Sequence, residues 1–341
     1  MPRIAIILSA ACSLLTGCDT TGPEFVDLSN VSVISTQTGS VIARIDVNLE
    51  SSDDIVVTGS GEYAYLLGVT PGPGIIAQID CSDFSLDTTF DVGSGMILGL
   101  SLELNEQDSR VYYYRMYPCE MLTYLEIPSG ARGDTLDLAQ NPVRGMASRP
   151  GTGNLYVVHS DQIEIVDEDA MEVAATLDIG GRGPAFSKTG SELYLLSDGR
   201  DSLMLLDPST GEILASASAG FRREFLCVCT VTRSGYVYAA ITDESLDTSG
   251  IYQLNAATLA FTDSLISDWQ YGRLCSIPGR DELYYYCSEA TGSNILIVSI
   301  PDLEIVGEAE ELVGLCGMCA HPSGDFVLCS VQYYGYPDSR W

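Results

Sequence analysis

Short apolar strands separated by glycine, proline or acidic turns recur along residues 31–332 at an interval of about 44 residues. Each unit contains a tyrosine just after a glycine or aspartate turn, as in the Gly-Ser-Glu-Leu-Tyr sequence at 190–194. A strand of small residues precedes the tyrosine strand and two short strands follow it, so each unit predicts four strands. Four strands in 40–50 residues are typical of a β-propeller blade. The aligned positions are Tyr65, Tyr112, Tyr156, Tyr194, Tyr238, Tyr284 and Val327.

The repeat predicts seven blades. The six complete units span 55–92, 98–138, 143–179, 182–218, 225–266 and 273–311. The seventh unit is divided, because 315–332 supplies its first two strands and 31–47 its last two. Pairing the two ends of the chain in one blade would close the ring without a free sheet edge. We therefore predict an all-β, seven-bladed propeller as a single domain over residues 31–341, with an open stack of sheets as the alternative architecture.

The beginning of the chain has the pattern of an export signal. Arg3 precedes a mostly apolar run over 4–15, which is too short to span a bilayer and suits a signal peptide. The run ends in Leu15-Thr16-Gly17-Cys18, which resembles the bacterial lipobox. That resemblance implies a lipoprotein signal peptide over 1–17, cleavage before Cys18, acylation of Cys18 and a lipidated tether over 18–30. Two acyl chains suffice for stable anchoring. The expected location is the bacterial cell envelope, with the leaflet open; the alternative is an ordinary signal peptide with an incidental cysteine.

The repeat itself resembles the YVTN, or surface-layer, type of propeller repeat. The His-Pro-Ser-Gly sequence at 321–324 is similar to the Pro-Asp-Gly turn of that family, whereas the family's asparagine after the tyrosine strand is mostly absent. The resemblance covers 31–332 and implies an exported seven-bladed propeller. It implies the fold and not a function.

Composition narrows the class of function. The 341 residues include 47 Asp and Glu but only 16 Lys and Arg, which gives a formal charge of −31. Removal of Arg3 with the signal would make it −31 − 1 = −32. Such a chain is unsuited to nucleic acid, whose phosphates are bound by Lys and Arg. Its 46% of apolar residues is enough to form a core.

The chain has 11 cysteines, and two pairs occupy equivalent places in their units. Cys275 and Cys319 each lie three residues before a turn proline, and Cys287 and Cys329 end the strands that follow. Since export favours disulfides, we predict the disulfides Cys275–Cys287 and Cys319–Cys329. Opposite residues of a hairpin are at the short limit for a disulfide, so reduced and packed cysteines are the alternative.

The cysteines give little support for a bound cofactor or metal. The Cys-Gly-Met-Cys-Ala-His sequence at 316–321 misses the haem-attachment motif because Ala320 stands between the second cysteine and the histidine. A zinc site formed by Cys316, Cys319, His321 and Cys329 is a further alternative. We expect no metal and no cofactor.

The search for catalytic residues also finds little. The repeat places His159 at the end of a tyrosine strand and His321 in a hairpin turn, at opposite ends of their strands. The sequence contains no Gly-x-Ser-x-Gly motif, phosphate-binding loop or dinucleotide fingerprint. An enzyme is therefore the less favoured interpretation.

Arginines recur at one place in the repeat. Arg144, Arg182 and Arg273 precede their blade tyrosines by 12, 12 and 11 residues, and Arg222 and Arg223 occupy a similar segment. In a propeller this segment leads into the innermost strand, so these side chains would form an arc at one mouth of the central channel. Arginine suits bidentate capture of carboxylate or phosphate. The arc is a candidate anion-binding mouth; a structural network of arginines and carboxylates is the alternative.

These features favour a membrane-anchored envelope lipoprotein that acts as a non-enzymatic binding scaffold. Its expected partners are the membrane and either another envelope protein or a small anionic ligand. One alternative is the propeller subunit of a periplasmic oxidoreductase, resembling the heavy chains of amine dehydrogenases. Another is an outer-membrane assembly lipoprotein. Fold alone does not choose among them.

Overall fold

The computed structural model describes most of the repeat region. The described residues are 28–49, 51–69, 74–93, 101–115, 121–139, 141–220, 223–230, 235–243, 248–267, 271–289, 292–309, 312 and 315–333. The predicted signal peptide, Cys18, Arg222 and residues 18–27 of the predicted tether lie outside them. No helix in the described part of the chain is long and apolar enough to cross a membrane.

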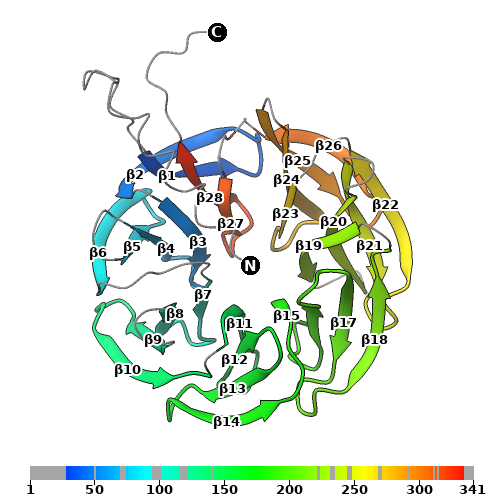
Figure 1. The fold of residues 1–341 in the computed structure, drawn as a ribbon. Coiled ribbons are helices and arrows are strands. Elements are labelled where there is room, and N and C mark those ends of the chain that lie inside the picture. Colours follow the sequence, from blue (N-terminus) through cyan, green and yellow to red (C-terminus); the bar gives the residue numbers. More distant parts are fainter. Residues whose placement is uncertain are drawn as a thin grey trace, which may run out of the picture.

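The described residues form seven four-stranded antiparallel sheets arranged as blades around a ring (Figure 1). Blade 1 consists of β3 (Ser51–Val57), β4 (Tyr63–Val69), β5 (Gly74–Asp80) and β6 (Ser85–Gly93). Blade 2 consists of β7 (Leu102–Leu104), β8 (Arg110–Arg115), β9 (Met121–Glu126) and β10 (Arg132–Asp137). Blade 3 consists of β11 (Val143–Arg149), β12 (Asn154–His159), β13 (Ile163–Asp167) and β14 (Glu172–Leu177). Blade 4 consists of β15 (Arg182–Phe186), β16 (Leu193–Leu196), β17 (Ser202–Leu206) and β18 (Ile213–Ser218).

The remaining three blades complete the ring. Blade 5 consists of β19 (Arg223–Thr230), β20 (Tyr236–Asp243), β21 (Thr248–Asn255) and β22 (Phe261–Ser267). Blade 6 consists of β23 (Tyr271–Ser276), β24 (Glu282–Glu289), β25 (Gly292–Ser299) and β26 (Glu304–Ala309). Blade 7 consists of β27 (Leu315–Ala320), β28 (Phe326–Tyr333), β1 (Leu28–Ser35) and β2 (Val41–Leu49).

Blade 7 confirms the predicted closure of the ring. Its strand order is β2-β1-β28-β27, so the two ends of the described chain pair in one sheet. Strand β1 pairs along its whole length with β28, from Leu28 opposite Tyr333 to Ser35 opposite Phe326. The all-β, seven-bladed architecture is therefore the one that the repeat predicts. Its first strand begins at Leu28, slightly before the predicted domain start at residue 31.

The common direction of the innermost strands distinguishes the two faces of the disc. Strands β27, β3, β7, β11, β15, β19 and β23 lie nearest the ring axis, and β2, β6, β10, β14, β18, β22 and β26 lie on the rim (Figure 1). Because every innermost strand has the same direction along the axis, we call the face where these strands begin the start face and the opposite one the end face. Strand β1 is the third strand of its blade, so it begins at the start face.

Hydrophobic cores lie between successive blades, and the recurring tyrosines form part of them. Tyr156 and Tyr194 are each 1% exposed and pack against the following blade. Their hydroxyls donate hydrogen bonds across the blade interface, from Tyr156 to the carbonyl of Pro208 (2.9 Å) and from Tyr194 to that of Ala256 (3.1 Å). In these two blades the aromatic ring fills the interface and the hydroxyl fixes a turn of the next blade.

The position aligned with these tyrosines in blade 7 is Leu328 and not Val327. Tyr284 in blade 6 faces blade 7, and Leu328 in blade 7 faces blade 1 in the same way. Val327 instead packs towards blade 6. Adjacent strand residues point to opposite faces of a sheet, so Val327 does not occupy the position of the blade tyrosines. The sequence alignment was therefore wrong by one residue in this blade.

The rim strands carry a recurring β-bulge near their beginning. In blade 4, Leu206 pairs with Ile213 and Leu205 with Ala215, so Leu214 is the extra residue. The same irregularity occurs in β2, β6, β14, β22 and β26. A bulge disturbs the open edge of a sheet and hinders edge-to-edge pairing with another chain.

Candidate functional site

The predicted arginine arc lies on the start face. Arg182 and Arg223 are the first residues of β15 and β19, Arg144 is the second residue of β11, and Arg273 lies near the beginning of β23. Because all four are at or near the beginnings of innermost strands, they lie on the same face of the disc, in the consecutive blades 3–6. Arg222 lies outside the described residues.

Two of these arginines share one carboxylate. Arg182 Nη2 donates to Asp198 Oδ1 at 2.9 Å, and Arg144 Nε lies 3.5 Å from the same oxygen. Asp198 belongs to the turn between β16 and β17, which also lies at the start face. One aspartate cannot neutralise two guanidinium groups, so this cluster retains one positive charge.

The other two arginines have different surroundings. Arg223 Nε donates to Asp243 Oδ2 at 2.8 Å, and this hydrogen bond, together with the nearby Tyr252, raises the pKa of Arg223. Arg273 is exposed, and no ion pair joins it to another residue of the described part of the chain. The arc thus combines local arginine–aspartate pairs with an exposed arginine, and it is not a broad basic surface.

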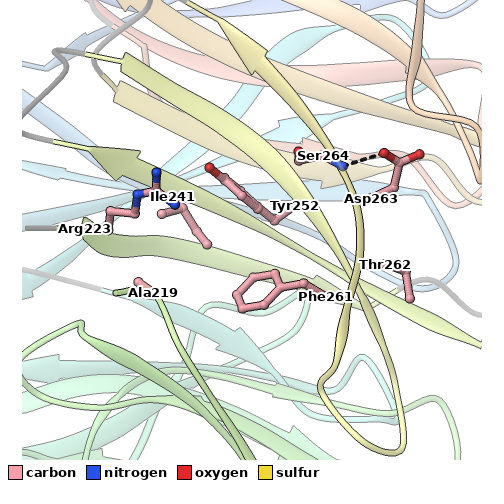
Figure 2. A pocket seen from close by; sticks show the side chains of 8 residues that line it. All are labelled: Ala219, Arg223, Ile241, Tyr252, Phe261, Thr262, Asp263 and Ser264. Atoms are coloured by element: carbon pink, nitrogen blue, oxygen red, sulfur yellow. Dashed lines mark hydrogen bonds between the residues drawn. The ribbon is translucent and has the colours of Figure 1, made fainter. Parts of the chain in front are cut away.

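A pocket of about 420 Å³ lies beside Arg223, between blades 4 and 5. It is lined by Ala219, Arg223, Ile241, Tyr252, Phe261, Thr262, Asp263 and Ser264. Figure 2 shows Arg223, Tyr252 and Phe261 on one side of β22, whereas the side chains of Thr262 and Asp263 point to the other side. The rings of Tyr252 and Phe261 meet edge to face, with centroids 5.8 Å apart. A cation beside two aromatic rings suits an anion that carries an apolar group.

The cysteines do not form the predicted disulfides; all four are thiols. Cys275 lies opposite Tyr284 and not opposite Cys287, while Cys319 lies opposite Leu328 and not opposite Cys329. In each pair the two side chains point to opposite faces of the sheet. Cys275 and Cys329 pack between blades 6 and 7, Cys287 between blades 5 and 6, and Cys319 between blades 7 and 1. Strand alternation therefore rules out both predicted pairings.

Three thiols occupy one position of the repeat in consecutive blades. Cys229, Cys275 and Cys319 each lie opposite the position of the blade tyrosine, on the innermost strand. Burial is the main cause that raises the pKa of all three thiols, to about 12 for Cys319. Hydrogen bonds from Ser276 to Cys229, and from the backbone of Ala320 to Cys275, oppose this effect. These protonated thiols fill the contact between neighbouring blades and are poor nucleophiles.

The zinc alternative does not fit the structure either. Within the described ranges, no group of three or more His, Cys, Asp or Glu side chains is placed to hold a metal ion. The ring of His321 contacts the carbonyl of Gly61 at 2.8 Å and the hydroxyl of Ser323 at 2.8 Å. His159 lies at the opposite face, as expected, and is completely buried against Glu164 (3.1 Å). The two histidines therefore do not share a site.

One notable acid was missed by the sequence analysis. Glu103, on β7, occupies the position that Cys229, Cys275 and Cys319 hold in their blades, and its Oε1 accepts a hydrogen bond from the Ser148 backbone N–H at 2.9 Å. Burial raises the pKa of Glu103 to about 8, the Ser148 hydrogen bond opposes this shift, and nearby carboxylates add to it. In the other blades this position holds a small or apolar residue. A carboxylate here is therefore the signal from which the aligned repeats could have revealed this acid.

Comparison with solved structures agrees with the fold. The β-propeller domain of Myceliophteria thermophila Cps50 (Swd1) matches with a TM-score of 0.63 and 11% identity, covering 82% of this chain and 96% of that one. Hydrazine synthase from Kuenenia stuttgartiensis matches with a TM-score of 0.66 and 13% identity, covering 86% and 97%. The WD40 repeats of RRP9 match with a TM-score of 0.66 and 9% identity, covering 89% and 98%. No family model and no curated sequence matches this chain.

The fold and these likenesses define the class: the chain is a seven-bladed β-propeller. At identities this low, the likeness extends to the scaffold and not to what the scaffold binds.

Proposed function

We propose that this chain is a lipid-anchored propeller of the bacterial cell envelope that binds an anionic ligand, or an acidic part of an envelope protein, at its start face without catalysing a reaction. The observation that carries the proposal is the gathering of Arg144, Arg182, Arg223 and Arg273 on one face of a chain with only 16 basic residues. Arginine remains charged at physiological pH and offers several donors in a fixed plane, which suits carboxylates and phosphates.

The charge distribution favours small anions over long polyanions. The chain as a whole carries a formal charge of −31 and repels polyanions at long range. Salt screens such repulsion beyond about 8 Å at physiological ionic strength. A compact carboxylate or phosphate can therefore approach the excess charge at Arg144 and Arg182, or the exposed Arg273.

The proposed anchor would attach to the chain on the same side of the disc as the arginines. Cys18 precedes Leu28, the first residue of β1, by 28 − 18 = 10 residues. An extended segment of that length spans at most about 35 Å. Because β1 begins at the start face, an acylated Cys18 would hold the beginning of β1, on the same face as the arginines, within that distance of the bilayer.

Calorimetry with acetate, inorganic phosphate and sulfate tests the binding function. We expect weak binding that declines with salt and is markedly weakened when Arg144 and Arg182 are both changed to Ala. Lys188→Ala is the matched control, since Lys188 is an exposed cation in the β15–β16 turn at the end face. Equal binding by wild type and the double variant would contradict the proposed role of this arginine pair.

The anchor has its own test. Cys18→Ala should block acylation and move the protein from the detergent phase to the aqueous phase in a phase-partitioning experiment. If both forms partition alike, the proposed lipid anchor is wrong, whatever the result with anions.

A further inference from the structure

The pocket beside Arg223 has features of a specific ligand site. We propose that it binds a small carboxylate whose other end is an aromatic ring. This inference deepens the proposed function, because it assigns the ligand class of one arginine of the start face and rests on the binding role of that face. The volume of about 420 Å³ is within the range of small-molecule sites.

The orientation of Arg223 is fixed by Asp243. The Nε–Oδ2 hydrogen bond of 2.8 Å uses one edge of the guanidinium plane, and Asp243 is itself mostly buried. Among the described residues, no hydrogen-bond or ion-pair partner is placed on Nη1 or Nη2. The edge formed by these two nitrogens is the one that binds a carboxylate with two parallel hydrogen bonds. The Arg223 side chain is 39% exposed, so a solute can reach it.

The aromatic wall provides the second half of the site. Phe261 remains 45% exposed although it packs edge to face on Tyr252. In Figure 2 the Phe261 ring extends into the pocket, and the Tyr252 hydroxyl points towards Arg223. The Tyr252 hydroxyl can donate to the same carboxylate, while Phe261 and Ile241 offer apolar surface to a ring.

The composition of the pocket selects against other ligands. The carboxylate of Asp263, the acid among the lining residues, accepts a hydrogen bond from the Ser264 backbone N–H (2.8 Å) and points to the other side of β22 (Figure 2). A cationic ligand would therefore meet Arg223 without a facing carboxylate inside the pocket. A small anion without a ring would leave Phe261 uncovered.

Titration of the full chain with three matched probes tests the site. The probes are 3-phenylpropionate, propionate and 3-phenylpropylamine, and their binding is measured by calorimetry and by ligand-observed NMR. We expect 3-phenylpropionate to bind at least about tenfold more tightly than propionate, and the amine not to bind. Phe261→Ala should weaken 3-phenylpropionate about tenfold and leave propionate unchanged. Arg223→Lys, which keeps the charge beside Asp243 but removes the planar fork, should weaken both acids.

Ile305→Ala is the control, because Ile305 is 50% exposed near the beginning of the rim strand of the next blade. It should bind all three probes as wild type does. Equal affinity of wild type and Phe261→Ala for 3-phenylpropionate would overturn the proposed ligand site. An absence of 3-phenylpropionate binding to wild type would also overturn it.

The outcomes separate this inference from the function on which it rests. Loss of carboxylate binding in the Arg144/Arg182 variant but not in the Phe261 and Arg223 variants would retain anion binding at the start face and reject the pocket. The reverse result would place the ligand in the pocket and reject the role of the Arg144–Arg182 pair. If wild type binds phosphate or sulfate but neither carboxylate, the pocket is rejected and the start-face function stands.

Discussion

The acid between blades 2 and 3 provides a quantitative test of the structure. Burial raises the pKa of Glu103 from 4.5 to about 8, although the Ser148 N–H partly stabilises its charged form. Folding therefore favours the protonated acid. The cost of ionising Glu103 in the folded state is nearly absent below pH 4.5, grows as the pH rises from 4.5 to 8 and is constant above that.

The size of this effect follows from the shift. A difference of 8 − 4.5 = 3.5 pKa units, at about 1.4 kcal/mol per unit, sets a ceiling of about 5 kcal/mol. The Glu103 side chain is only partly shielded from solvent, so we expect roughly 2 kcal/mol. Replacement of Glu103 by Gln keeps an oxygen for the Ser148 N–H and removes the charge. Glu103→Gln should therefore match wild type in stability near pH 5 and exceed it by roughly 2 kcal/mol at pH 8.

The assay is urea unfolding at pH 5, 6, 7 and 8, followed by tyrosine fluorescence and far-ultraviolet circular dichroism. It measures the difference in unfolding free energy between Glu103→Gln and wild type. The difference between variant and wild type is the informative quantity, because other carboxylates titrate in both proteins. Glu304→Gln, on the exposed rim strand β26, should show no comparable change between pH 5 and 8. A constant difference between Glu103→Gln and wild type across this range would refute the assignment of a raised pKa to Glu103.

Three further predictions follow from the blade interfaces and from the ring closure. Tyr194→Phe removes the hydroxyl that bonds the Ala256 carbonyl and should lower the unfolding free energy by about 1 kcal/mol, measured by urea denaturation. Deletion of the chain from Phe326 onwards removes β28, which pairs with both β1 and β27, and should cause aggregation or loss of cooperative unfolding by calorimetry; melting like wild type would contradict the closure. The buried Cys275 thiol should resist a maleimide reagent in the native protein and react after unfolding, and a Cys275–Cys287 crosslink in a non-reducing digest would contradict the strand register.

The architecture could be predicted from the sequence because it depends on periodicity. The predicted unit 182–218 coincides with the observed bounds of blade 4, and the divided unit pairs as expected. Repetition over seven units averages out errors in any single strand. The closing blade was assigned correctly because its two halves complete each other in strand number, which needs no knowledge of side-chain contacts.

The cysteine pairing was predicted wrongly because it depends on strand register at the level of one residue. Cys319 lies opposite Leu328, so Cys329 is displaced by a single position and points to the other face of the sheet. In blade 6, Cys287 is three positions beyond Tyr284, the partner of Cys275. Bulges and turn lengths set these offsets, and the sequence pattern does not specify them. The same single-residue sensitivity explains the misplaced alignment at Val327.

The sequence predicts one part of the candidate site and not the rest. Placement of the arginines on one face follows from their common position in the repeat, which the sequence contains. Their ion pairs with Asp198 and Asp243 do not, because each partner comes from a different strand or turn and the pairing depends on side-chain reach. The pocket was missed for a further reason, since Phe261 and Tyr252 look like ordinary strand residues in the sequence, and only the packing of the strands shows that they line a pocket.

The position opposite the blade tyrosine shows how a repeat can point to an exceptional residue. The seven residues there are Val56, Glu103, Ala147, Ala185, Cys229, Cys275 and Cys319. Six are small or apolar because the side chain must fit between two innermost strands and against a buried ring. A carboxylate at this place costs free energy whenever it is charged, so its presence in blade 2 is a departure from the packing requirement that the other blades obey. Once strand register aligns the units, such a departure can be read directly from the sequence, as it can at Glu103.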